Sequence, residues 1–132
     1  MNNDLLRILI AEPRPTRRRS LEKLLNAEGL YGIATARSDE ELMKLAGVGF
    51  DLILIEHAMA GSEHSAVSRK LLNGSRRRHM LRYRSDDREP GAVEAKQYGN
   101  SLLLSMPGCP DAPLLRQLIR HVRAGLPEHA ED

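Results

Sequence analysis

Three polar side chains follow apolar, strand-like segments of the chain and could together bind a cation. Glu12 follows one such segment, Glu56 ends another, and Ser85 follows a third. If these segments are parallel strands of one sheet, their carboxyl ends meet at the same edge, where ligand sites of open α/β sheets lie. Carboxylate and hydroxyl oxygens are the ligands that a hard cation such as Mg²⁺ prefers. The alternative interpretation is that each strand simply ends in water with a polar residue.

Five short apolar segments have the composition of strands that are buried on both faces of a sheet. They cover residues 6–11, 31–36, 50–56, 79–85 and 101–105. The fourth segment is less regular, because Arg82 and Arg84 alternate with Leu81 and Tyr83. This alternation suits an edge strand, or a strand with one buried face, better than a central strand.

Helical patterns separate these segments. One helix follows Pro15 and ends before Gly29, and a second begins at Ser38, where Glu41 completes a capping box. A third covers about residues 65–72, any helix within residues 85–99 is short and starts late, and a final amphipathic helix precedes residue 125. Strands that alternate with helices form βαβ units, so we predict an α/β fold with a five-stranded parallel, doubly wound sheet.

Composition and charge exclude several classes of protein. A chain of 132 residues is long enough for one domain core, and we expect a domain at residues 1–126 with a loose tail at residues 127–132. No apolar run approaches the roughly 20 residues that span a membrane, and no signal pattern begins the chain, so we expect no membrane association and a cytoplasmic location. Cys109 is the only cysteine, which excludes an intramolecular disulfide and a cysteine-rich metal site.

Two clusters of arginine residues raise the alternative of nucleic-acid binding. The clusters are Arg14, Arg17, Arg18 and Arg19, and Arg76, Arg77, Arg78, Arg82 and Arg84. Runs of this kind are usually solvated faces. Aromatic residues make up only 3% of the chain, so few rings are present on which bases could stack. We therefore rank nucleic-acid binding below the other interpretations.

Three strings of the sequence resemble the receiver domain of bacterial response regulators. RILIAEPRP, residues 7–15, is similar to the first strand of that family with its acidic pair. FDLILIEHAMAG, residues 50–61, resembles the segment that contains the phosphorylated aspartate, and YGNSLLLSMPG, residues 98–108, resembles the segment whose Lys-Pro pair closes the site. The resemblance covers about residues 6–125 and implies the flavodoxin-like receiver fold.

The resemblance also implies that the working residues of the family are largely replaced here. The acidic pair is reduced to Glu12, the phosphoacceptor aspartate falls on Glu56, and the phosphoryl-binding lysine falls on Met106. The hydroxyl residue of the fourth strand falls near Ser85, and the aromatic residue that moves on activation falls on Leu103. Phosphoryl transfer depends on positioning and on cations, so we expect no aspartyl phosphorylation, no catalytic residue, no enzyme activity and no cofactor.

The expected function is therefore that of a stand-alone, degenerate pseudo-receiver that acts through protein–protein interaction in two-component or phosphorelay signalling. The resemblance implies an interaction face at the fourth and fifth strands and the last two helices, where Arg82, Arg84, Arg116, Arg120 and Arg123 lie. A basic face predicts a partner with an acidic surface, such as a histidine kinase or another regulator, and a homodimer is a further option.

Three alternatives stay open. The first is a receiver with residual Mg²⁺ or phosphoryl binding at Glu12, Glu56 and Ser85, in which Glu12 and Glu56 would form a weak metal site. The second is a nucleic-acid-binding regulator that uses the arginine clusters. In the third, Glu56 supplies a permanent negative charge in place of a phosphoryl group, although a phosphoryl group carries about −1.5 to −2 and a glutamate only −1.

Overall fold

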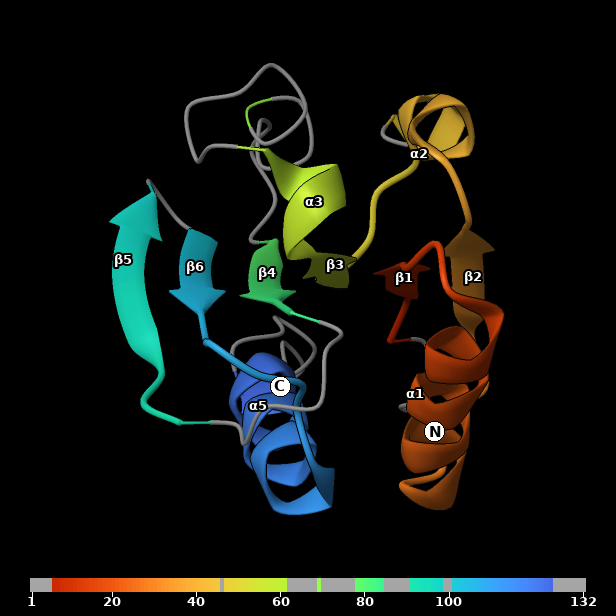
Figure 1. The fold of residues 1–132 in the computed structure, drawn as a ribbon. Coiled ribbons are helices and arrows are strands. Elements are labelled where there is room, and N and C mark those ends of the chain that lie inside the picture. The colour runs from red at the N-terminus through yellow and green to blue at the C-terminus, as the bar shows by residue number, and fades with distance from the viewer. Residues whose placement is uncertain are drawn as a thin grey trace.

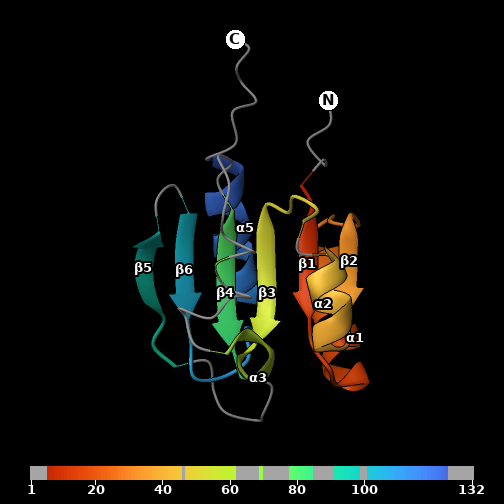
Figure 2. The same ribbon diagram turned by 90° about the horizontal axis from the view of Figure 1, so that it is seen from above.

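A mostly parallel β-sheet of six strands forms the centre of the protein. The computed structural model describes residues 6–45, 47–61, 69, 78–84, 91–98 and 101–124. The strands are β1 (Ile8–Ala11), β2 (Ile33–Ala36), β3 (Leu52–Glu56), β4 (His79–Tyr83), β5 (Glu94–Tyr98) and β6 (Ser101–Ser105). They lie side by side in the order β2-β1-β3-β4-β6-β5. Strand β5, at the edge, runs antiparallel to its neighbour β6, whereas the other strands are parallel to one another (Figure 2).

Helices cover both faces of this sheet. Helices α1 (Pro15–Ala27) and α5 (Ala112–Ala124) lie on one face, and α2 (Asp39–Leu45) lies on the other (Figure 1). The short helix α3 (His57–Ala60) follows β3 directly at the carboxyl edge of the sheet. The predicted α/β class is therefore confirmed. Within the described part of the chain, no helix is long and apolar enough to cross a membrane.

Alternate side chains of β1 and β3 enter two separate cores because successive residues of a strand point to opposite faces. Ile8, Ile10 and Leu54 pack with α1 and α5, whereas Leu9 and Ile53 belong to the core on the α2 and α3 side. Strands that are buried in this way on both faces are continuously apolar. This is why the first and third predicted strands, β1 and β3, are found where the apolar runs placed them.

The predicted starts of α1 and α2 are confirmed, with one correction. Pro15 occupies the first turn of α1, and Gly29 after its end has a φ of 84°, which glycine adopts without strain. Ser38 Oγ accepts a hydrogen bond from the Glu41 N–H at 3.2 Å, as the capping box predicts. The carboxylate of Glu41, however, accepts from the N–H of Arg37 at 2.8 Å and not from that of Ser38.

The prediction of a five-stranded, wholly parallel sheet is wrong. Residues Glu94–Tyr98, expected to contain a short helix or none, form β5, which pairs antiparallel with β6. The fourth strand was expected to be an edge strand or a strand with one buried face, and not a central strand. It is central, because β4 lies between β3 and β6 and β5 forms the edge. The predicted tail at residues 127–132 lies outside the described residues, as does the predicted helix at residues 65–72 apart from residue 69.

Candidate functional site

Glu12 is a fully buried carboxylate at the carboxyl end of β1. Its N–H donates to the carbonyl of Ala36 at 3.0 Å, which extends the pairing between β1 and β2 by one residue. Its side chain has an exposed fraction of 0%. Oε1 accepts a hydrogen bond from the Tyr83 hydroxyl at 2.7 Å, and Oε2 accepts one from the N–H of Arg14 at 3.0 Å. Both oxygens are thus used inside the protein, as burial of a carboxylate requires.

Tyr83 ends β4 and supplies the donor that Glu12 accepts. Its side chain is fully buried and packs in the core formed with α1 and α5. Burial raises the pKa of the Tyr83 phenol well above its ordinary value, and the nearby charge of Glu12 raises this pKa further. The phenol therefore stays protonated and remains a hydrogen-bond donor across the neutral range.

Glu56 ends β3 and caps the helix that follows. It has extended backbone angles, φ −71° and ψ 142°, and its Oε1 accepts a hydrogen bond from the N–H of Ala58 at 2.8 Å. This bond satisfies one of the backbone donors that a helix leaves unpaired at its first turn. The segment after Glu56 begins as the one-turn helix α3. In the pairing of β3 with β4, Glu56 lies directly opposite Tyr83.

By resemblance to receiver domains, the lysine of that family corresponds to Met106 and its mobile aromatic ring to Leu103. Met106 follows β6, its N–H donates to the carbonyl of Arg82 at 3.0 Å, and its side chain is buried in the same core as Tyr83. Leu103 is buried in the core on the opposite face of the sheet. Ser85 lies outside the described residues. The structure thus gathers Glu12, Glu56 and Met106 around Tyr83, which was not predicted as a site residue.

The residues of this corner do not fit a magnesium ion. The carboxylate of Glu12 has no exposed surface and already accepts two hydrogen bonds, and the next residue, Pro13, has no side-chain oxygen. Across the described ranges, no group of three His, Cys, Asp or Glu side chains is placed to hold a metal ion. A cation at Glu12 would have to displace the Tyr83 hydroxyl from a buried position.

The arginine residues of the predicted interaction face lie in two separate places. The three arginines of α5, Arg116, Arg120 and Arg123, are all exposed. The guanidinium of Arg116 also forms an ion pair at 3.1 Å with Glu28, the residue that follows α1. Arg82 is half-buried in the middle of the sheet, where Nη2 donates to the carbonyl of Gly61 at 2.8 Å. Arg84 is exposed just beyond β4. The five residues therefore do not form one continuous surface.

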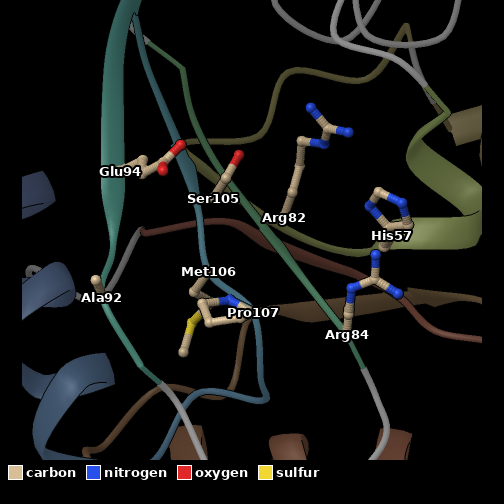
Figure 3. A pocket seen from close by; sticks show the side chains of 8 residues that line it. All are labelled: His57, Arg82, Arg84, Ala92, Glu94, Ser105, Met106 and Pro107. Atoms are coloured by element: carbon tan, nitrogen blue, oxygen red, sulfur yellow. The ribbon is translucent and has the colours of Figure 1, made fainter. Parts of the chain in front are cut away.

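A cavity of about 350 Å³ opens at the carboxyl ends of β4 and β6, on the side where β5 lies. Figure 3 shows the side chains that line it, which belong to His57, Arg82, Arg84, Ala92, Glu94, Ser105, Met106 and Pro107. This cavity was not predicted from the sequence, and neither His57 nor Glu94 was expected to be a site residue. One sequence signal did point to it, namely the alternation of arginine with buried residues along the fourth strand.

Comparison with protein-family models and with curated proteins finds no match for this chain. Its function must therefore be inferred from the residues of the site and from their geometry.

Proposed function

We propose that this chain is a receiver-like signalling module that acts by binding a protein partner in two-component or phosphorelay signalling and is not phosphorylated on a carboxylate. The observation that carries the proposal is the buried hydrogen bond between Tyr83 and Glu12. A phosphorylated receiver needs an open acidic corner that recruits a cation. Here the one remaining acid of that corner, Glu12, is fully buried and accepts a hydrogen bond from the neutral phenol of Tyr83.

The strand order supports a relation to the receiver fold. The five parallel strands lie in the order β2-β1-β3-β4-β6, and with the antiparallel β5 set aside this is the 2-1-3-4-5 order of flavodoxin-like sheets. The segment between the last two parallel strands departs from the family, because β5 takes up part of the connection in which receivers have a helix. The partner surface of this module is therefore expected to differ from that of the family on the β5 side.

The other two positions of the site support loss of phosphoryl transfer. Glu56 is one methylene longer than aspartate, and its carboxylate is engaged with the N–H of Ala58. A misplacement of ~1 Å at a reacting group can lower the rate ~10²-fold. Met106 has a buried thioether in place of an ammonium group, so it cannot neutralise charge in the transition state. The three changes act on the same reaction and leave the scaffold intact.

The exposed arginines of α5 are the part of the predicted interaction face that remains open to a partner. Arg120 and Arg123 lie on the outer side of the helix, whereas Leu115, Leu118 and Ile119 face the core. Opposite charges across an interface speed association and select the partner. We therefore propose an acidic protein surface as the partner of α5.

The absence of phosphorylation is tested with beryllofluoride, a mimic of the phosphoryl group, and Mg²⁺. We expect the amide NMR signals of Glu12, Glu56 and Tyr83 to be the same with and without beryllium, at equal concentrations of Mg²⁺ and fluoride. Saturable shifts at these residues that require both beryllium and Mg²⁺ would contradict the proposal and favour the residual receiver site.

The partner surface is tested by reversing charges on α5. In quantitative capture from the native cell extract, the double variant Arg120→Glu/Arg123→Glu should lose the protein that the wild-type chain retains. The matched control is Arg19→Glu/Lys23→Glu on α1, which reverses two exposed charges on a different helix. Equal retention by the wild type and the α5 variant would show that α5 is not the binding surface.

A further inference from the structure

We propose that the cavity lined by Arg82, Arg84 and His57 binds a small molecule that carries a phosphate group. This site adjoins the buried corner at Glu12, because Met106 belongs to both, but the carboxylates of Glu12 and Glu56 do not line the cavity. It also does not depend on whether the chain is related to receivers, because it rests only on the residues of the cavity. It would make the module responsive to a metabolite instead of to phosphorylation.

Arg82 is the first reason for this inference, because it lies at a position of the sheet where an apolar side chain is expected. It pairs in register with Ile55 on one side and Ser105 on the other. Ile55 is part of the core on the α2 and α3 side of the sheet. Arg82 Nε is buried and has no hydrogen-bond partner among the described residues, although Nη2 donates to Gly61. Burial of an unsatisfied donor is costly, and an anion in the cavity supplies the kind of acceptor that Nε lacks.

Arg84 provides a second guanidinium on the same side of β4. Residues two apart in a strand point the same way and are separated by roughly 7 Å. Both arginines line the cavity, and in Figure 3 the guanidinium of Arg84 points toward the ring of His57. Planar guanidinium groups present several N–H donors in an arrangement that matches the oxygens of a phosphate. The hydroxyl of Ser105, opposite Arg82 in the register, adds a further donor.

The charges and the size of the cavity limit the ligand to a small anion. The cavity is lined by two guanidinium groups and one imidazole but by only one carboxylate, that of Glu94. Figure 3 shows Glu94 on the β5 side next to Ser105, so the anion is expected on the side of Arg84 and His57. A volume of about 350 Å³ is at the lower end of the range for small-molecule sites, roughly 300–1,000 Å³. A small phosphate ester fits such a space, whereas a nucleic-acid chain does not.

The test is an NMR titration of the full chain with inorganic phosphate, with ionic strength held constant by chloride. We expect saturable shifts of the amide signals of Arg82, Arg84 and Ser105. Arg84→Gln removes one exposed guanidinium and should weaken binding about tenfold, as loss of a charge-assisted hydrogen bond does. Glu94→Gln removes the one acidic lining group and should strengthen binding. The matched control, Arg120→Gln, removes an exposed arginine from α5 and should leave the affinity unchanged.

Chemical shifts that do not saturate would overturn the proposal, and so would an unchanged phosphate affinity of the Arg84→Gln variant. An equal loss of phosphate affinity in Arg84→Gln and Arg120→Gln would also overturn it, because that result would indicate general charge attraction. The far-UV circular dichroism of each variant should match that of the wild type, since the substituted residues Arg84, Glu94 and Arg120 are all exposed. The titration contains no Mg²⁺ or beryllium, so its outcome is independent of the test for phosphorylation at Glu56.

Discussion

Replacing Tyr83 by phenylalanine removes one oxygen atom from the interior and leaves Glu12 Oε1 without the donor that lies 2.7 Å away. Hydrogen bonds to charged groups contribute about 1.5–3 kcal/mol to stability. Both side chains are fully buried, so water cannot take the place of the lost hydroxyl. We therefore expect Tyr83→Phe to lower the free energy of unfolding by about 2–3 kcal/mol. In a domain of this size the melting temperature should fall by roughly 6–15 °C.

The assay is urea unfolding followed by far-UV circular dichroism, with linear extrapolation to water. Tyr31→Phe is the matched control because it removes the same atom from a side chain that is 74% exposed. An exposed substitution of this kind should change the free energy of unfolding by less than about 0.5 kcal/mol. The difference between the two variants therefore isolates the environment of the Tyr83 hydroxyl.

Equal effects of Tyr83→Phe and Tyr31→Phe would contradict this prediction, since the buried hydrogen bond would then contribute nothing to the free energy of unfolding. A double-mutant cycle with Glu12→Gln tests the pairing itself. If Tyr83 and Glu12 interact directly, the two substitutions should be non-additive by about 1–3 kcal/mol. Additivity within roughly 0.5 kcal/mol would assign the loss of stability to some other contact of the phenol.

Three further perturbations have defined outcomes. Burial raises the pKa of Tyr83, so above about pH 10 the unfolded chain loses the phenol proton while the folded chain keeps it. The free energy of unfolding should therefore fall as the pH rises further, by up to ~1.4 kcal/mol per pH unit. Tyr83→Phe should remove that part of the slope in urea unfolding at alkaline pH, and Tyr31→Phe should not. Glu56→Ala removes the cap of α3 and should lower the stability of this helix by about 1 kcal/mol. The measurement is hydrogen exchange of the Gly61 amide, which should become faster in Glu56→Ala and stay slow in Glu56→Asp. Leu103→Tyr inserts an aromatic ring into a filled core and should lower the free energy of unfolding by about 1–3 kcal/mol without any gain of beryllofluoride binding.

Strands β1 and β3 could be predicted from the sequence because they are buried on both faces and are short continuous apolar runs. Strand β5 could not be predicted in the same way, since its residues Glu94–Tyr98 are largely polar and its described side chains are exposed. A different signal was available. Gly99 and Asn100 separate β5 from β6 in the sequence, and a Gly-Asn pair between two short segments is typical of a two-residue hairpin connection.

The positions of Glu12 and Glu56 at the carboxyl edge of the sheet follow from the ends of two predicted strands, but the partner of Glu12 does not. Tyr83 lies 71 residues away in the sequence. Which residue of β4 meets Glu12 depends on register, and here Glu56 pairs with Tyr83. A shift of one residue would turn an arginine toward Glu12 and the tyrosine toward the opposite face. Local pattern alone does not fix that register.

The alternation along β4 connects the two proposals, because one strand supplies different chemistry to each face of the sheet. Leu81 and Tyr83 enter the core beside α1 and α5, where Tyr83 seals the acidic corner at Glu12. Arg82 and Arg84 line the cavity on the other side. The tyrosine that contacts Glu12 and the arginines that line the basic cavity thus come from consecutive positions of one strand. Taken together, the two proposals describe a buried corner at Glu12 that does not bind a cation and a neighbouring cavity whose fixed positive charge holds an anion without a metal.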